Sequence, residues 1–286
     1  MSDCQPNACP TECYDWIFQR VVTLPRIRGG TRVEWYLSDQ FQDPLPWSFQ
    51  LQVGSTGSNV ASDWSNVGPP AINTWYLLDD EDRVYGLQQW THYRIQLTTS
   101  SGVYYSNPAP CLGTWGFRKW RLAQGILRAE TVNFKAGEGK DGYVLKRKIS
   151  GIPCPCLDTL TAEVRRAQHE LCYGTGWLGG YYEPVGCCYA LMLRSGIKPG
   201  IEPEGPRGQS ADVIVQARML AIPQLGENDV WVDKDTDHRY IVRGISTEKG
   251  CEVQGVPVVY EPITLHLLPF SDIVYNFPIP YEVPAW

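Results

Sequence analysis

Long hydrophobic runs are missing from this 286-residue sequence. No stretch approaches the roughly 20 consecutive apolar residues that a membrane-spanning helix needs, so we expect no membrane partner. The first residues, Met-Ser-Asp-Cys-Gln-Pro, also lack the apolar centre of a secretory signal peptide. An excess of positive charge is missing as well, because the chain has 25 Lys and Arg residues but 31 Asp and Glu residues. The resulting net charge of −6 argues against wholesale binding of nucleic acid, and we expect no sequence-specific nucleic-acid partner.

Sequence motifs that are typical of catalytic sites are also missing. The sequence contains no Gly-x-Ser-x-Gly and no His-Glu-x-x-His motif, and its four histidines are too dispersed for a catalytic cluster. Asp233, Asp235 and Asp237 resemble half of a calcium loop. However, His238 and Gly244 stand where that loop requires Gly and Glu, which favours a solvated hairpin tip. Because no pair of carboxylates is singled out for acid-base chemistry, we expect a protein that is not an enzyme.

Proline, glycine and aromatic residues are abundant instead. The 22 Pro and 27 Gly residues predict short strands separated by many turns. Hydrophobic residues make up 43% of the chain and charged residues 20%, which is typical of a globular protein. Long amphipathic helices are scarce. The sequence therefore predicts a mainly β fold, and the chain is long enough to form two domains with separate cores.

Residues 14–112 alternate between apolar and polar side chains with a period of two. This pattern and the turn clusters between the segments predict an antiparallel β-sandwich. The stretch resembles a fibronectin type III domain, in which Trp35 would be the buried strand-B tryptophan and Tyr93 the tyrosine-corner residue. Domains of this kind mostly bind or space other domains, so the resemblance implies no chemistry. The alternating side chains are Val33, Trp35 and Leu37, then Trp47, Phe49, Leu51 and Val53, then Tyr93, Ile95 and Leu97.

Residues 113–286 are predicted to form a second β-rich domain that contains one or two short helices. One helix is expected at about 115–135 and another at about 158–172, because each range carries an apolar stripe at helical spacing. A hairpin is expected over 229–245, and it resembles those of small β-barrel adaptor and head-closure proteins in phage necks. The tail, 275–286, carries three prolines among aromatic residues and should be extended. The clearest expected strands are 142–150, 213–219, 229–233, 238–245 and 256–268.

Four potential metal ligands fall within the Cys-rich segment 152–188. Cys154 and Cys156 precede the expected second helix, and His169 and Cys172 lie at its end, where a three-residue spacing places them on one face. The sequence leaves three interpretations open. The four side chains could bind one structural zinc ion, they could form disulfides with one another or with Cys187 or Cys188, or they could be reduced thiols.

The first 13 residues form a separate Cys-rich arm. Its spacing, Cys-x4-Cys-x3-Cys, matches no common zinc pattern, which leaves incidental thiols or disulfides within the arm or to a neighbouring subunit. The candidates for disulfide formation outside the four-ligand cluster are Cys4, Cys9, Cys13, Cys187, Cys188 and Cys251.

The segment from Tyr143 to Val185 resembles part of structural proteins found near the head-to-tail junction of long-tailed bacteriophages. In those proteins a Cys-x-x-Cys pair precedes a second pair that runs into Cys-Tyr-Gly-Thr-Gly and then Gly-Gly-Tyr-Tyr. Here the first pair is shortened to Cys154-x-Cys156, and His169 stands where a cysteine is usual. The match covers about forty residues and is weaker over the rest of the second half.

This resemblance implies a structural virion protein, assembled in the cytoplasm of the host bacterium. We expect a subunit of a neck, connector or collar ring, whose partners are copies of itself and other neck or tail proteins. The alternatives are a receptor- or glycan-binding module of the tail or baseplate and, less favoured by the motifs, a tail-associated lysin. The aromatic residues expected at the interface are Trp177, Tyr181, Tyr182, Tyr275, Phe277 and Trp286.

Overall fold

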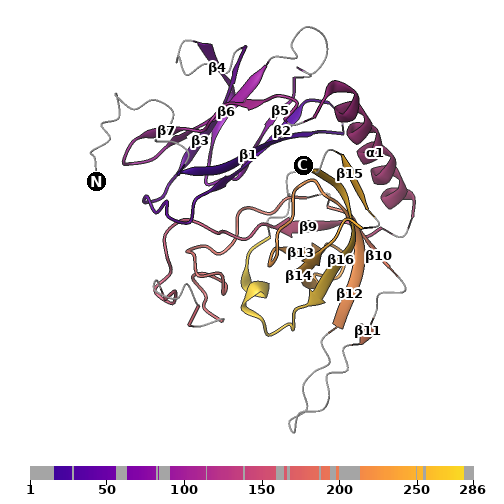
Figure 1. The fold of residues 1–286 in the computed structure, drawn as a ribbon. Helices are drawn as coiled ribbons and strands as arrows, with labels where there is room; N and C mark the ends of the chain where they lie inside the picture. Colours follow the sequence, from indigo (N-terminus) through magenta and orange to yellow (C-terminus); the bar gives the residue numbers. More distant parts are fainter. Residues whose placement is uncertain are drawn as a thin grey trace. The chain divides into compact units, whose positions relative to one another are not determined.

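A computed structural model gives the fold of the chain (Figure 1). The described residues form two compact units, one built mainly on the chain up to Trp120 and the other mainly on the chain from Arg121 onward. Within the described residues, no helix has the length and apolar character needed to cross a membrane. The structure describes residues 16–279 except for 28, 56–62, 82, 84–90, 114, 138, 159–163, 166–167, 187, 194–197, 200–212, 249 and 254–255.

The N-terminal unit contains two antiparallel sheets, as the alternating pattern predicted (Figure 1). One sheet has the order β1-β2-β5, and the other has the order β4-β3-β6-β7 with β8 paired to β6. The strands are β1 (Phe18–Pro25), β2 (Thr31–Leu37), β3 (Ser48–Gly54), β4 (Trp64–Ile72), β5 (Tyr76–Asp79), β6 (His92–Thr98), β7 (Val103–Tyr105) and β8 (Ala109–Pro110).

The predicted aromatic residues form the core between these two sheets. Trp35 on β2 and Phe49 on β3 are both buried, and their ring centroids lie 4.9 Å apart. Tyr93 on β6 is fully buried, and its hydroxyl donates to the Asp79 carboxylate at the end of β5 over 2.7 Å. The residues chosen as strand-B tryptophan and corner tyrosine therefore join one sheet to the other, which is the arrangement of a sandwich.

Helix α1 (Phe117–Ala136) is the only α-helix in the part of the chain that the structure describes. It confirms the prediction for 115–135, and its predicted stripe of Trp120, Ala123, Leu127 and Phe134 is at most 2% exposed. Gly125 lies on the exposed side of this helix, where an added Cβ would meet nothing within 4 Å.

Replacing Gly125 by alanine should therefore stabilise the helix. Alanine restricts the unfolded chain and favours helical geometry, whereas the exposed position imposes no packing cost. We expect the free energy of unfolding to rise by up to about 1 kcal/mol. Urea denaturation of the two proteins measures the change, and a loss of stability would show that this position is not open helix surface.

The C-terminal unit contains one curled antiparallel sheet with the order β10-β12-β16-β14-β13-β9, in which β11 also pairs with β12 and β15 with β16 (Figure 1). The predicted hairpin is present as β13 and β14, and the predicted long strand near the C-terminus is present as β16. The strands are β9 (Gly142–Leu145), β10 (Ala190–Met192), β11 (Lys198–Pro199), β12 (Val213–Leu220), β13 (Val230–Asp233), β14 (Arg239–Ile245), β15 (Cys251–Val253) and β16 (Val256–Leu267).

The two ends of this sheet approach each other. Backbone bonds of 2.9–3.0 Å pair Lys140 with Ala190 and Val144 with Val185, so the segment that leads into β10 also bonds to β9. The curl agrees with the barrel-like fold predicted for this half. Part of its hydrophobic core is a cluster of buried side chains, namely Leu145, Tyr181, Val230, Val232 and Val274.

One local prediction for this half is wrong. The residues of 158–172 that the structure describes form turns, bends and an isolated bridge rather than a second helix. The extended tail predicted for 275–286 lies mostly outside the described residues. Its first two residues end the 3-10 helix η4 (Ile273–Asn276), which the Asp272 side chain caps by accepting from the Val274 N–H, and Phe277 then has extended backbone angles. Only Phe277, Pro278 and Ile279 continue from η4 within the described residues, and the rest of the tail, 280–286, lies outside them.

Candidate metal centre

Four side chains of the Cys-rich segment converge in the structure. The Sγ atoms of Cys154, Cys156 and Cys172 and a ring nitrogen of His169 all lie within 4.8 Å of one another. The three cysteines are 2%, 7% and 0% exposed. These are the four ligands that the sequence singled out, and together they form a candidate metal site that is consistent with zinc. Among the described residues it is the one such group.

Cys154 and Cys156 lie on a tight turn. The N–H of Leu157 donates to the carbonyl oxygen of Cys154 at 2.8 Å, which closes a four-residue turn with Pro155 in its second position. Proline suits this position because its ring fixes φ near the value that the turn requires. The Cys-Pro-Cys sequence therefore presents both thiols from one restricted piece of backbone.

His169 and Cys172 lie on a second turn. The N–H groups of Cys172 and Tyr173 both donate to the carbonyl oxygen of His169, at 3.3 and 2.8 Å. Tyr173 then adopts a positive φ of 49°, which ends the helical path after a single turn. The N–H and hydroxyl of Thr175 donate to the Cys172 carbonyl at 2.9 and 2.7 Å. The backbone of this ligand turn is thus fixed by hydrogen bonds.

The glycine-rich run after Cys172 lets the chain fold back against this turn. Gly180 has a φ of +64°, and a Cβ at this position would lie 2.7 Å from the Cys172 carbonyl oxygen and 2.8 Å from the Tyr173 ring. The approach is therefore too close for any side chain larger than hydrogen. The irregular backbone predicted for the segment after Cys172 is confirmed, since its described residues form turns, bends and isolated bridges.

Contacts within the C-terminal unit hold the second ligand turn in place. The Gln168 side chain accepts from the Ile273 N–H at 2.7 Å, and the Arg147 guanidinium donates to the Thr175 carbonyl at 3.1 Å. Phe277 packs edge-on against Tyr173 and Tyr181, with centroid distances of 5.2 and 5.6 Å. The position of His169 and Cys172 therefore depends on residues about a hundred positions away in the sequence.

The spacing within the cluster suits tetrahedral zinc. Cys172 Sγ and His169 Nδ1 are 3.6 Å apart. With bonds of about 2.3 Å to sulfur and about 2.0 Å to nitrogen, a tetrahedral zinc ion would place these two atoms roughly 3.6 Å apart. Four protein ligands fill a tetrahedral shell and leave no position for water or substrate. A metal bound here would therefore be structural rather than hydrolytic.

The predicted disulfide candidates are not joined in the described residues. Cys4, Cys9, Cys13 and Cys187 lie outside those residues, so no contact can be assigned to them. The six cysteines that the structure describes form no disulfide. Cys251 is half-buried on β15.

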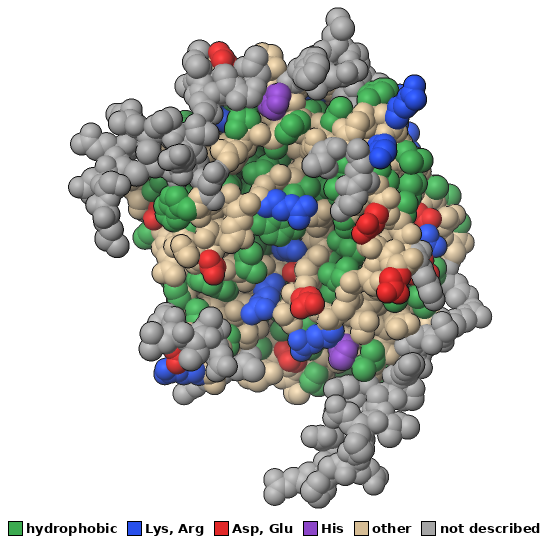
Figure 2. All heavy atoms as spheres, viewed as in Figure 1, with side chains coloured by type: hydrophobic (Ala, Val, Ile, Leu, Met, Phe, Trp, Pro, Cys, Tyr) green, Lys and Arg blue, Asp and Glu red, His purple; other side chains and the backbone are tan. Residues whose placement is uncertain are grey.

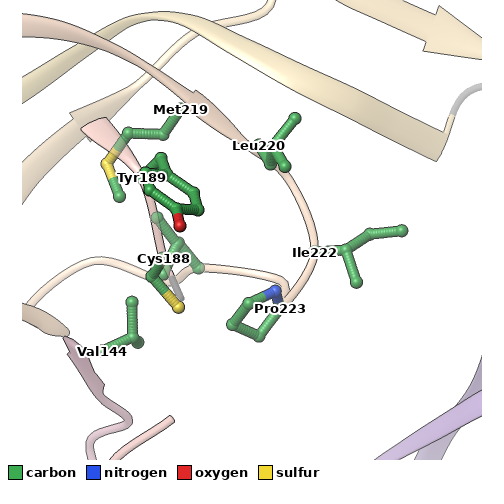
Figure 3. Close-up of a pocket in the computed structure, with 8 residues that line it drawn as sticks. Val144, Cys188, Tyr189, Met219, Leu220, Ile222 and Pro223 are labelled. Carbon is green, nitrogen blue, oxygen red and sulfur yellow. The ribbon is translucent and has the colours of Figure 1, made fainter. Parts of the chain in front are cut away.

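Cys188 points into a small cavity inside the curled sheet (Figure 3). Its thiol also donates to the Val185 carbonyl at 3.3 Å. The cavity has a volume of about 10 Å³, which is about the space that one water molecule needs. Side chains thus fill this part of the sheet, and the cavity is too small for an organic ligand. Its lining residues are Val144, Cys188, Tyr189, Met219, Leu220, Ile222, Pro223 and Leu225.

The predicted interface aromatics differ in their surroundings. Tyr181 and Phe277 pack in or against the core of their own chain, so they hold the tail to the sheet. Tyr275 is half-buried, and its hydroxyl donates to the Leu268 carbonyl at 3.2 Å. Trp177 and Tyr182 are half-buried and retain some accessible surface. Trp286 lies outside the described residues.

Asp233, Asp235 and Asp237 lie at the tip of the β13–β14 hairpin. Asp233 is fully buried, and its carboxylate accepts from Lys140 Nζ at 2.6 Å and from the Asp235 N–H at 3.0 Å. Burial alone would raise the pKa of Asp233, but these bonds and the charge of Lys140 outweigh it and lower the pKa below the ordinary value. Asp235 and Asp237 are exposed.

This lowered pKa predicts a contribution to acid stability. A carboxyl whose pKa is depressed on folding stabilises the fold above its unfolded pKa and loses that contribution as pH falls through the folded value. We therefore expect the stability difference between wild type and Asp233→Asn to be largest near neutral pH and to shrink below about pH 4. Urea unfolding between pH 3 and pH 7 measures it, and a difference independent of pH would contradict the assignment.

Cys111 is a buried thiol that sequence reasoning missed. It lies 3.8 Å from both the Tyr93 hydroxyl and the Thr31 hydroxyl. Burial raises the pKa of Cys111, so the thiol stays protonated and is a structural part of the sandwich. Cys111 directly follows β8, a strand that the sequence analysis did not predict.

Comparison of the chain with protein-family models, with curated proteins and with solved structures found no match.

Proposed function

We propose that this chain is a non-enzymatic structural protein of a tailed-phage virion and a subunit of a ring at the head-to-tail junction. The observation that carries the proposal is the segment 143–185, where the phage-like sequence coincides with the cluster of four potential metal ligands. The resemblance gives the location, and the described site agrees with a structural role because its ligand set is closed.

We also propose that Cys154, Cys156, His169 and Cys172 bind one zinc ion. Three thiolates and one imidazole are ligands that zinc favours, and the 3.6 Å separation between Cys172 Sγ and His169 Nδ1 fits its tetrahedral geometry. The segment has little regular secondary structure, so a bound metal would hold its two turns together.

Features of the two units support a role in assembly. The sandwich resembles a domain that binds or spaces other proteins, and the curled sheet has a filled interior around its small cavity. A ring subunit contacts its neighbours through its outer surfaces, and we propose that the function of this chain lies there.

Quantitative mass spectrometry of purified particles tests this proposal. In phage that encode the chain, we expect it at a small, fixed copy number relative to the major capsid protein. A chain found in infected cells but missing from particles, or present at a variable sub-stoichiometric level, would contradict a ring subunit and would favour a lysin or accessory role.

A further inference from the structure

Helix α1 carries a second apolar stripe on its outer face. Leu122 and Val132 are 57% and 63% exposed, and Gly125, Ala129 and Ala136 continue the same line at spacings of three and four residues. The inner stripe is already buried, so these side chains add nothing to the core of their own chain. A continuous apolar line on an exposed helix is the form of a docking surface.

Basic side chains surround this outer stripe. The helix carries five cations and a single carboxylate, Glu130, which pairs with Arg218 at 2.9 Å. The other residues of the chain contribute 20 cations and 30 carboxylates. Figure 2 shows hydrophobic and basic side chains together over α1 at the upper right. The helix is thus a positive surface on a chain that is otherwise strongly negative. Its cations are Arg118, Lys119, Arg121, Arg128 and Lys135.

The same chain contains an exposed aromatic ring beside two exposed carboxylates. Phe270 is 68% exposed, and its ring lies 5.4 Å from the ring of His238 and 5.1 Å from that of Tyr275. Asp235 and Asp237 are exposed on the neighbouring hairpin tip. The Asp237 side chain retains 64% of its accessible surface and pairs with the buried Arg239 at 3.5 Å, while Lys234 on the same tip pairs with Asp141. We call Phe270, His238, Tyr275, Asp235 and Asp237 the acidic aromatic patch.

We infer that the outer face of α1 docks against the acidic aromatic patch of a second copy of this chain. An apolar stripe with a basic rim complements an exposed aromatic ring beside carboxylates. Two α1 helices would instead bring like charges together. In Figure 1, α1 lies at the upper right of the C-terminal unit and the yellow segment around 268–279 at its lower left.

Contact between two different surfaces is heterologous and repeats from copy to copy. Such a contact closes into a ring when the rotation between copies permits it. The inference therefore rests on the proposed ring and names the surfaces through which its subunits would meet. It is tested on the purified full chain, independently of any particle.

Sedimentation velocity at low and high salt measures the association. We expect oligomers of the wild type at 50 mM NaCl and weaker association at 500 mM, because salt screens the rim charges. Leu122→Asp should weaken association at least about tenfold, since it places a charge in the apolar stripe. Ile72→Asp is the matched control: Ile72 is 62% exposed on β4, outside both surfaces, and this variant should associate as the wild type does.

A charge exchange identifies the two surfaces as partners. The double variant Arg118→Glu and Lys119→Glu should fold, because carboxylates are favourable in the first turn of a helix. It should associate at least about tenfold more weakly, as should Asp235→Lys with Asp237→Lys, and combining all four changes should restore association. Circular dichroism confirms that each variant is folded.

Three results would overturn this inference: a wild-type monomer at both salt concentrations, unchanged association of Leu122→Asp, or no restoration by the combined variant. A wild type that stays monomeric but binds a separate acidic protein would also overturn it. The ring proposal fails separately. A chain that associates through α1 but is missing from particles contradicts the virion role, whereas normal incorporation of Leu122→Asp into particles contradicts only the docking surface.

Discussion

Replacing Cys172 by serine is expected to abolish binding of one zinc ion per chain. Cys172 is fully buried within the four-ligand cluster, and the loss of one thiolate opens the tetrahedral shell. Apparent binding energies of structural zinc sites are on the order of 10 kcal/mol, so losing the metal should lower the unfolding midpoint by about 10 °C or more. Metal analysis after dialysis, combined with calorimetry, measures both effects.

Cys111→Ser is the matched control for this experiment. It also replaces a buried thiol, but Cys111 belongs to the sandwich and lies outside the cluster. We expect it to reduce stability while leaving the zinc content at one ion per chain. The zinc assignment would be wrong if the wild type, purified under reducing conditions with zinc present, contained no stoichiometric metal, or if Cys172→Ser retained it.

Replacing Asp229 by alanine is expected to destabilise the C-terminal unit by about 3–5 kcal/mol. Asp229 is 2% exposed, and its carboxylate accepts from Lys146 Nζ at 2.8 Å, from the Arg147 N–H at 2.8 Å and from the Gly226 N–H at 2.7 Å. Alanine would leave a buried ammonium group without its counter-charge and two N–H groups without their carboxylate acceptor.

The exposed pair of Lys234 and Asp141 provides the control for Asp229. Its charged atoms are 3.4 Å apart, and Lys234 keeps 51% of its side-chain surface accessible. Asp141→Ala should therefore cost less than about 1 kcal/mol. Chemical denaturation of both variants gives the comparison. Similar losses of stability in the two variants would show that burial does not set the strength of the Asp229 pair.

Regular elements could be predicted from the sequence because their signal is local. The alternation in 229–233 and 238–245 placed β13 and β14 to within one residue at each end, and the stripe from Trp120 to Phe134 located α1. In both cases the signal lies in residues that are close together in the sequence.

Within the described residues of 158–172, the apolar stripe of the predicted helix does not form one buried face. Leu171, a member of that stripe, is 57% exposed. The bond from the Tyr173 N–H to the His169 carbonyl makes one helical turn, and the positive φ of Tyr173 stops it. The apolar spacing in the sequence detected that single turn. It could not reveal the hydrogen bonds from Thr175 to the Cys172 carbonyl and from the Ile273 N–H to the Gln168 side chain, which hold irregular backbone around the turn.

Long-range partners could not be predicted. The sequence identified the four ligands of the cluster, but the spacing of these residues could not separate zinc from disulfides or reduced thiols. The convergence of the four side chains depends on two turns, the second of which is held by contacts with residues far away in the sequence. The sequence also assigned Tyr181 and Phe277 to an interface with a neighbour, and in the structure the two rings pack against each other. An aromatic residue has the same sequence signal whether it contacts its own core or a neighbouring subunit.

Immunogold labelling of intact phage particles tests the central claim most directly. Antibodies raised against the N-terminal unit should label one axial position, at the junction between head and tail, in nearly every particle. Particles treated with antibodies adsorbed on the purified chain should carry no label. Label at the distal tip of the tail, along the tail shaft, or on no particle would contradict the assignment of this protein to a ring at the head-to-tail junction.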